Sequence, residues 1–405
     1  MANTREKTRV KTSEKKSDGN RSTRSSRSSR SSRHKRSNKT SNKITKAIKS
    51  KLLTFGKWIK RTFKKSPLKF ILVIVFVVAG SYLIITNAFR FHDRIETGDY
   101  THAEKFDNYL IIEGIDVSYA QGDIDWKAVK NSGVDFAFIR AGYRSTDKGS
   151  LNVDEYFYDN VKKAEDAGVM VGLYYFSQAI TAKEAQEEAE ALIDLAKDYD
   201  VQLPLVMDYE KADGGRLSNA ISNGDISVWD LNQIAATFTN VVEKAGYESM
   251  VYANYDFLQN YLDGEWLDDY TNIWGAQYNT SAQFTCNYQF WQCSDSWTVP
   301  GIEGNVDHNF WYFDKANGWA SVGGTDSEDR TSISDLNVSV KDNAVKYIGF
   351  AKEPGVKVKK GWRRLWNNFS YKTAYVHNTK EGTGYAIVQG IGKYKDMIAV
   401  PFEIS

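Results

Sequence analysis

The sequence has few cysteines and lacks the short motifs that mark nucleotide-binding folds. Cys286 and Cys293 are the only cysteines, and no His or Cys lies near them at zinc-site spacing, so we expect no metal. In an oxidising compartment the two could close a small loop. No Gly-x-Gly-x-x-Gly or Gly-x-x-x-x-Gly-Lys follows a candidate strand, so dinucleotide and phosphate-loop folds lack their defining feature, and we expect no cofactor.

Acidic residues are scarce at the N-terminus. Residues 1–69 hold 24 of the 53 Lys and Arg residues but 3 of the 51 Asp and Glu residues, although the whole chain of 405 residues has a net charge of only +2. Residues 1–68 include the run RSTRSSRSSRSSRHKRS, which has almost nothing apolar to bury and predicts disorder. Such a tail could bind nucleic acid. No aromatic nucleic-acid motif accompanies it, so we favour attraction to an anionic membrane leaflet and expect no nucleic-acid partner.

A long apolar run follows the basic tail. Residues 69–89, with FILVIVFVVAGSYLII at their centre, are long enough to span a bilayer as one helix. A cleaved signal peptide is the rival interpretation, but its charged leader is normally far shorter than 68 residues. The Lys and Arg residues just before the run predict a cytoplasmic N-terminus. We therefore expect a single-pass protein of the cell membrane, with the chain beyond about residue 90 outside the cell.

From about residue 110, short apolar segments alternate with segments of helical period. TAKEAQEEAEALIDLAKDY opens on a capping-box signature at Thr181 and Glu184, and SVWDLNQIAATFTNVVEKAG runs from Ser227 to Gly246. Alternating strands and helices predict parallel strands with crossovers. Eight candidate strands predict a closed, irregular (β/α) barrel of the TIM type, because the last three are too close for full helices. These strands are IIEGIDVSY, FAFIRAGYR, VMVGLYYFS, LPLVMDYE, SMVYANY, NIWGAQY, YQFWQCS and NVDHNFW.

Two carboxylates end the strand LPLVMDYE. Side chains alternate along a strand, so Asp208 and Glu210 should face the same side as Val206. In barrels of this type the site lies at the C-terminal ends of the strands, where Asp116 and Asp307 also fall. Four acids at one mouth raise one another's pKa at a cost in stability, so catalysis by paired acids explains them better than a solvent-exposed strand end.

Several motifs then resemble one family, in their order and spacing. GIDVSYAQGDIDW, FIRAGY, GLYYFS, LVMDYE, WGAQY, FWQCS and NVDHNF are similar to motifs of the family 25 glycoside hydrolases, the barrel-shaped muramidases or lysozymes, over residues 110–315. The resemblance implies cleavage of the β-1,4 bond between N-acetylmuramic acid and N-acetylglucosamine in peptidoglycan. It implies Glu210 as general acid and Asp208 as its partner, with Asp116 and Asp307 completing the acidic floor.

The role of the second carboxylate stays open between two routes. It either acts as a nucleophile or orients the substrate's acetamido group, and we favour the assisted route. Arg140 either binds substrate carboxylates or holds one of the acids. Aromatic residues at strand ends either stack on sugars or belong to the core. The candidate substrate-binding residues are Arg140, Tyr143, Tyr175, Trp274, Gln277 and Trp291.

The C-terminal part differs from the barrel in pattern. Residues 316–332 form a polar link, and residues 333–405 alternate as short strands that resemble a bacterial Ig-like repeat, with GIGKY before the last strand. We expect a small β-sandwich that serves either as a spacer or wall-contact module or as a purely structural appendage. Its KVKKGWRRLW segment could meet an anionic wall polymer or simply be a solvated face.

These patterns together predict a membrane-anchored peptidoglycan hydrolase. The expected order is the tail at 1–68, the transmembrane helix at 69–89, a linker at 90–109, the barrel at 110–315, a second linker at 316–332 and the Ig-like domain at 333–405. Its expected partners are peptidoglycan glycan strands, the membrane and other cell-envelope proteins, and its catalytic domain would face the cell wall. The rival hypothesis is a non-catalytic glycan-binding or adhesion protein on the same scaffold.

Overall fold

A computed structural model describes residues 100–315 and 330–405 of the chain. The predicted tail and transmembrane segment at 1–89 lie outside the described residues, as do residues 90–99 and 316–329. Within the two described ranges, no helix is both long and apolar enough to cross a bilayer. The membrane anchor therefore stays a prediction.

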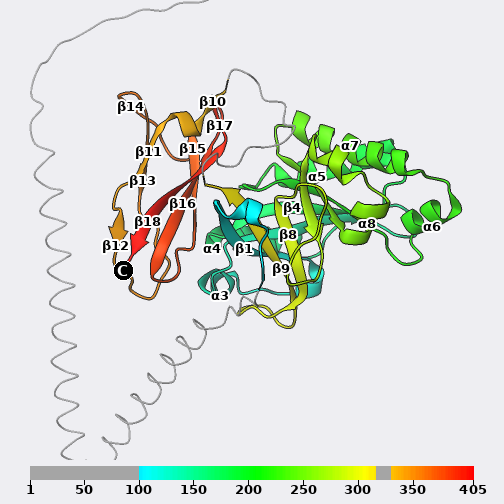
Figure 1. Cartoon of the computed structure of the whole chain (residues 1–405), viewed down its shortest axis with the longest axis horizontal. Helices are drawn as coiled ribbons and strands as arrows, with labels where there is room; N and C mark the ends of the chain where they lie inside the picture. The colour runs from blue at the N-terminus through cyan, green and yellow to red at the C-terminus, as the bar shows by residue number, and fades with distance from the viewer. Residues whose placement is uncertain (1–99, 316–329) are drawn as a thin grey trace, which may run out of the picture. The chain divides into compact units, whose positions relative to one another are not determined.

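Eight strands close a barrel, one for each segment predicted from the sequence (Figure 1). They follow the order β1-β9-β8-β7-β6-β5-β4-β2, and the pairing of β1 with β2 closes the ring. A short strand, β3 (Leu151–Val153), pairs with β2 outside the ring. The barrel strands are β1 (Tyr109–Val117), β2 (Phe136–Arg144), β4 (Met170–Ser177), β5 (Leu205–Tyr209), β6 (Ser249–Asn254), β7 (Asn272–Ala276), β8 (Phe290–Trp297) and β9 (Val306–Asp314).

The barrel departs from a parallel (β/α) pattern at its last strand. β9 runs antiparallel to both β8 and β1, whereas the other pairs around the ring are parallel. A parallel connection needs a crossover of a dozen or more residues, and the chain between Trp297 and Val306 is shorter than that. Asp307 therefore lies at the start of β9 rather than at a C-terminal strand end. It still reaches the mouth, because it pairs in register with Asp116.

Helices cover the outside of the barrel. Thr181 caps α5 by accepting a hydrogen bond from the Glu184 amide, but the Glu184 carboxylate accepts one from the Ile180 amide instead of completing the predicted capping box. Ser227 and Asp230 form a full capping box on α7. The helices are α3 (Trp126–Asn131), α4 (Phe157–Ala167), α5 (Ala182–Ala196), α6 (Arg216–Asn223), α7 (Val228–Lys244), α8 (Tyr255–Asn260) and α9 (Gly264–Asp268).

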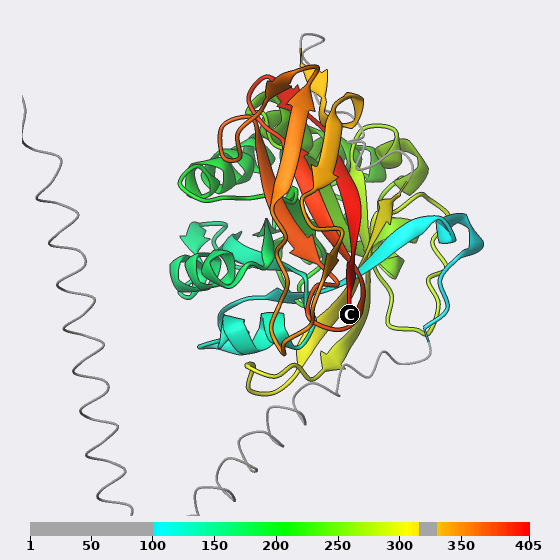
Figure 2. The ribbon, with the colours of Figure 1, turned by 90° about the vertical axis from the view of Figure 1, so that its left-hand side faces the viewer.

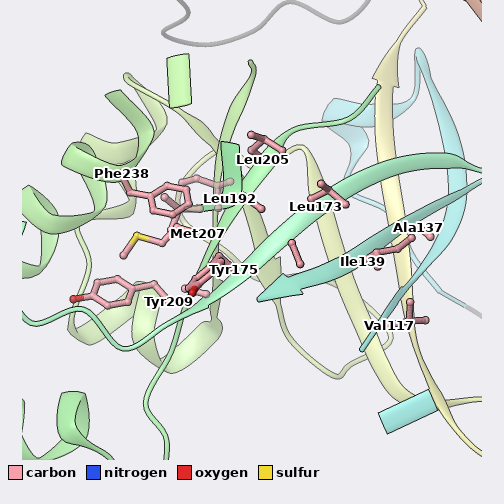
Figure 3. Packing of buried hydrophobic residues seen from close by; sticks show 14 of the residues in the cluster. Val117, Ala137, Ile139, Leu173, Tyr175, Leu192, Leu205, Met207, Tyr209 and Phe238 are labelled. Atoms are coloured by element: carbon pink, nitrogen blue, oxygen red, sulfur yellow. The ribbon is translucent and has the colours of Figure 1, made fainter. Parts of the chain in front are cut away.

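The strands separate two hydrophobic layers, because successive side chains point alternately into the barrel and out toward the helices. Along β4, Tyr174 belongs to the cluster inside the barrel, whereas Tyr175 belongs to the cluster between the strands and the helices. Figure 3 shows Tyr175 in this outer layer, with Leu192 of α5 and Phe238 of α7 among the other labelled members. Inside the barrel the rings of Phe138 and Trp274 stack with centroids 4.5 Å apart, so the interior is a packed core rather than a pore.

Parts of the two predicted linkers, 90–109 and 316–332, belong to the folded domains. Tyr100 packs edge-on against Trp291 and Phe310, and Phe106 is buried in the outer core, so residues 100–109 join the barrel domain. The C-terminal domain begins at Thr331 rather than at residue 333, because β10 starts there.

The C-terminal domain is all β, as the alternation predicted. Its two larger sheets have the orders β12-β18-β16-β15 and β11-β13-β14, and one hydrophobic cluster includes residues of both (Figure 2). Its relation to bacterial Ig-like repeats stays a prediction. The strands are β10 (Thr331–Ser332), β11 (Asn337–Val340), β12 (Ala344–Val345), β13 (Val356–Lys360), β14 (Arg363–Arg364), β15 (Tyr371–Val376), β16 (Gly382–Gly390), β17 (Tyr394–Lys395) and β18 (Met397–Ile404).

A buried ion pair joins the two domains. Lys130 and Asp135 are 2.6 Å apart and almost fully buried. Lys130 Nζ also donates to the Tyr375 carbonyl at 2.9 Å, and the His377 amide donates to Asp135 Oδ2 at 2.7 Å. Apolar side chains of β15, β16 and β18 extend the cluster inside the barrel, namely Val376, Ile387 and Met397. The β domain therefore contributes to the barrel's own core.

We predict that Asp135→Ala lowers the free energy of unfolding by about 3–5 kcal/mol, because it leaves the buried Lys130 charge without its negatively charged partner. Lys372→Ala is the matched control, since it removes the partly exposed ion pair with Asp200 and should cost at most about 1 kcal/mol. Urea denaturation of both variants measures the difference. Equal losses would contradict a structural role for the buried pair.

Candidate active site

The four predicted carboxylates meet in one cavity at the mouth of the barrel. The cavity has a volume of about 270 Å³. Asp116 and Asp208 are buried, at 8% and 7% exposure, and Glu210 and Asp307 are partly buried. The full lining is Asp116, Arg140, Tyr174, Phe176, Asp208, Glu210, Tyr252, Trp274, Tyr278, Gln292 and Asp307.

The position of the acid pair follows from β5. Val206 lies in the cluster inside the barrel, whereas Met207 and Tyr209 pack outward against the helices. Asp208 therefore points inward, and Glu210, one residue past the strand end, lines the same cavity. The alternation anticipated from the sequence is confirmed here.

Asp116 is held by two amide side chains that the sequence analysis did not single out. Gln292 Nε2 and Asn309 Nδ2 donate to Asp116 Oδ1 at 2.8 and 2.7 Å. The amides are fixed in turn, because Tyr252 donates to Gln292 Oε1 at 2.9 Å and Trp274 Nε1 donates to Asn309 Oδ1 at 2.8 Å. Each amide therefore presents its N–H group to Asp116, which suits an ionised carboxylate.

Burial and hydrogen bonding shift the pKa of Asp116 in opposite directions. Burial raises its pKa to about 6, while the hydrogen bonds from Asn309 and Gln292 lower it. Near neutral pH the carboxylate is therefore mainly ionised. Its charge then acts on every other acid in the cavity.

The surroundings of Asp208 favour its neutral form, whereas those of Asp116 favour the ionised form. Burial raises its pKa well above the usual range, and the charges of Glu210 and Asp116 raise it further, while Arg140 opposes them. Within the described part of the chain, no protein group donates a hydrogen bond to Asp208 Oδ1. The resting site therefore favours a proton on Asp208.

Glu210 and Asp307 also hold protons more tightly than ordinary carboxyls. Burial raises the pKa of Glu210, a hydrogen bond from Asn254 lowers it, and the charge of Asp116 raises it. Burial raises the pKa of Asp307 to about 8, and the charges of Asp116 and Asp295 add to this effect. Asp295, an exposed residue of β8, was not anticipated.

Arg140 pairs with an acid outside the predicted four. Its Nε and Nη2 both donate to Asp154 Oδ2 at 2.7 Å, and Asp154 is 2% exposed. The guanidinium lies 4.8 Å from the Tyr119 ring centre and 5.4 Å from that of Tyr143. It lines the carboxylate cavity and an adjoining hollow of about 410 Å³ that includes Tyr119 and Tyr143.

Two of the predicted sugar-stacking residues face away from the barrel mouth. Tyr175 and Trp291 are 1% and 0% exposed and belong to the layer outside the barrel, so neither can stack on a bound sugar. The reason is strand alternation: their neighbours Tyr174 and Gln292 face inward and line the cavity. Strand parity identifies these inward-facing neighbours once the register between adjacent strands is known.

The other predicted binding residues each line a different hollow of the site. Trp274 lines the carboxylate cavity at 1% exposure and so forms its floor. Tyr143 lines the adjoining hollow. Gln277 lines a third hollow with Glu210 and Asn254, and its Oε1 accepts a hydrogen bond from the Gln283 amide at 2.8 Å.

Neither a disulfide between the two cysteines nor a metal-binding cluster is found among the described residues. Cys286 and Cys293 are both buried and free, and burial raises their pKa values to about 11 and about 12. Across residues 100–315 and 330–405, no group of three or more His, Cys, Asp or Glu side chains is arranged to hold a metal ion.

Comparison with known proteins places this geometry in context. The family described as glycosyl hydrolases family 25 matches residues 115–302, a range that includes Asp116, Asp208 and Glu210 but ends before Asp307. The uncharacterized protein YegX of Escherichia coli O157:H7 is 30% identical over 207 residues, which cover 49% of this chain and 68% of that protein.

Two further relatives are lysozymes by name. Lysozyme M1 of Streptomyces globisporus is 27% identical over 207 residues, covering 49% of this chain and 67% of that protein. The autolytic lysozyme of Clostridium acetobutylicum is 27% identical over 240 residues, covering 57% and 66%. The chain thus spans about two thirds of the length of these relatives.

Among solved structures, a family 25 glycosyl hydrolase from Bacillus anthracis is 24% identical with a TM-score of 0.43, covering 55% of this chain and 97% of that one. The modular autolysin LytC of Streptococcus pneumoniae is 25% identical with a TM-score of 0.44, covering 50% and 47%.

We predict that Asp307→Asn stabilises the chain increasingly as pH rises. The folded pKa of Asp307, about 8, lies above the ordinary value of 3.8, so the folded state binds more protons than the unfolded state between these values. The unfolding free energy of the native chain therefore falls across this window, and the variant removes that fall. Denaturation from about pH 4 to about pH 8 measures it. A gain confined to acid pH would contradict the assignment, and Asp213→Asn, at an exposed residue, is the control.

Proposed function

This chain belongs to glycosyl hydrolases family 25 and is a glycoside hydrolase of the muramidase class, and from that premise we propose that Glu210 is its general acid. The proposed reaction is hydrolysis of the β-1,4 bond between N-acetylmuramic acid and N-acetylglucosamine in peptidoglycan. The observation that carries the proposal is the pair Asp208 and Glu210 at one cavity with the ionised Asp116.

Glu210 suits the role of proton donor because its environment raises its pKa and so favours the protonated form. Burial raises its pKa, and the charge of Asp116 raises it further. In the proposed first step, Glu210 gives its proton to the glycosidic oxygen as the bond from that oxygen to the anomeric carbon breaks. Asp116 stays ionised beside the positive charge that develops on the sugar, since Gln292 and Asn309 both donate to it.

Asp208 supports the substrate-assisted route over the nucleophilic one. Its buried Oδ1 receives no donor from the described protein groups, and the N–H of a substrate acetamido group is a donor of the required kind. A hydrogen bond from that N–H would favour the ionised form of Asp208, which would release its proton to solvent as the substrate binds, and would aim the acetamido oxygen at the anomeric carbon. Water would then attack the anomeric carbon of the cyclic intermediate and return a proton to Glu210.

The remaining cavity residues would bind the glycan. Arg140, oriented by Asp154, stands between the carboxylate cavity and the hollow lined by Tyr143. We assign these two residues, with Trp274 and Gln277, to substrate binding, and Asp307 to the acidic floor. Tyr175 and Trp291 are left out because both are buried outside the barrel.

The proposal keeps the topology expected from the sequence. Residues 69–89 would anchor the chain in the cell membrane with the N-terminus in the cytoplasm, and the barrel would face the cell wall outside. The support is the uncharged apolar run and the basic residues before it. Peptidoglycan strands would be the substrate, and other envelope proteins remain candidate partners.

We predict that Glu210→Gln lowers turnover of purified peptidoglycan by at least about 10²-fold, because a positioned general acid contributes that much or more. Asp213→Asn, which changes an exposed acid of the same loop, should leave turnover unchanged. Mass spectrometry of the digest would detect new reducing ends on muramic acid. Binding of intact glycan by the native chain without any new ends would instead support the adhesion hypothesis.

We further predict that Asn254→Asp moves the alkaline limb of the pH–rate profile to higher pH. The Asn254 side chain accepts from the Phe257 amide to cap α8, a role that Asp retains, and it also lowers the pKa of Glu210 by a hydrogen bond. Losing that donor and adding a carboxyl raises the pKa of Glu210, so the proton is kept to higher pH. An unchanged or acid-shifted limb in kcat would contradict Glu210 as the acid.

A further inference from the structure

A turn of the β domain presents large aromatic side chains directly to solvent. Trp362 is 96% exposed at the turn between β13 and β14, and Trp366 and Phe369, which follow it, are 63% and 83% exposed. Gly361, with φ of 60°, allows the tight turn. Exposed aromatic residues in such a group mark an interaction site more often than a free surface.

These aromatic residues are not displaced core residues. Val358 and Leu365 of the same hairpin point inward and fill the core of the β domain, at 0% and 4% exposure. Trp362 and Phe369 lie in turns next to these core residues, and β13 pairs with β14 in register through Lys359 and Arg364. The fold therefore holds the exposed side chains on a rigid support.

The same turn carries a dense positive charge. From residue 354 to residue 380 the chain has no Asp or Glu. Within the described residues, none of the hairpin's basic side chains forms an ion pair, whereas Arg364 stacks over Trp366 at 5.2 Å. We call the following set the hairpin patch: Lys357, Lys359, Lys360, Trp362, Arg363, Arg364, Trp366 and Phe369.

The combination fits the surface of an anionic bilayer better than a wall polymer. Tryptophan favours the headgroup level of membranes, and clustered Lys and Arg favour anionic lipids. Trp362, at 96% exposure, stands clear of neighbouring side chains that could hold a sugar by hydrogen bonds beside its ring. An anionic polymer would account for the charges but leave Trp362 and Phe369 without an apolar partner.

The short stretch of chain before the barrel keeps the barrel domain close to the proposed anchor. Only residues 90–99 separate the proposed anchor from Tyr100, which is packed on the barrel, and they span at most about 35 Å when extended. This tether raises the effective concentration of the bilayer surface at the domain. That step rests on the proposed anchor, whereas the aromatic exposure and charge of the hairpin patch do not.

We propose that the hairpin patch docks on the anionic outer leaflet of the cell membrane, inserting Trp362, Trp366 and Phe369 at the headgroup level. Docking would give the chain a second membrane contact beyond its proposed anchor. It would restrict the orientations of the barrel, and hence the depth of wall that its active site reaches.

The test uses the full chain in lipid nanodiscs with an environment-sensitive fluorophore on Asn367→Cys, an exposed site between Trp366 and Phe369 of the hairpin patch. Cys286 and Cys293 are buried with raised pKa, so the new thiol takes the label selectively. The control label is at Lys183→Cys on α5, where the native side chain is 84% exposed. The lipids are phosphatidylglycerol mixtures against pure phosphatidylcholine.

Docking predicts a blue shift and quenching by spin-labelled lipid at 367, only with phosphatidylglycerol, and neither effect at 183. Adding Lys359→Gln and Lys360→Gln should lower the ratio of docked to free hairpin by about 25-fold, since each basic residue near an anionic leaflet contributes about fivefold. A label at 367 as exposed as that at 183 would overturn the proposal. A blue shift at 367 that appears only after soluble teichoic acid is added would also overturn it, in favour of a wall polymer. Neither readout depends on hydrolysis, so failure here leaves the proposed activity untouched.

Discussion

The cost of burying several carboxyl groups in one cavity is the constraint on which the rest of the site depends. A carboxylate that leaves water must either gain hydrogen-bond donors or take up a proton. Asp116 follows the first course, with two amide donors on one oxygen. In Asp208, Glu210 and Asp307 burial raises the pKa, which favours the second course. One cavity thereby places a carboxylate with two amide donors beside acids of raised pKa, and glycoside hydrolysis uses such a difference between carboxyl groups.

The barrel interior ties this electrostatic arrangement to packing. Trp274 stacks on Phe138 and also orients Asn309 through its indole N–H, and Tyr252 packs against Trp274 while orienting Gln292. Loss of aromatic packing would therefore release the amides that keep Asp116 ionised. The antiparallel β9 contributes as well, since its register sets Asp307 beside Asp116.

Sequence patterns predicted the parts of this account that depend on local periodicity. Eight apolar segments became the eight barrel strands, and the alternation through Val206, Asp208 and Glu210 placed the acid pair correctly. Tyr175 and Trp291 were assigned to the wrong face, because aromatic residues are common on both sides of a barrel strand and only register distinguishes them. Gln292, Asn309 and Asn254 were missed because neutral amides gain their roles from partners far away in the chain. The close spacing of the last three segments predicted an irregular barrel, but not that β9 runs antiparallel to both of its neighbours.

Neutron diffraction from crystals of the chain near neutral pH would test the central claim most directly, since it locates the exchangeable deuterium on each carboxyl. We predict deuterium on an oxygen of Glu210 and none on Asp116, with the amide deuterons of Gln292 and Asn309 directed at Asp116. A deuterated Asp116 beside a bare Glu210 would contradict the division of roles on which the proposed mechanism stands.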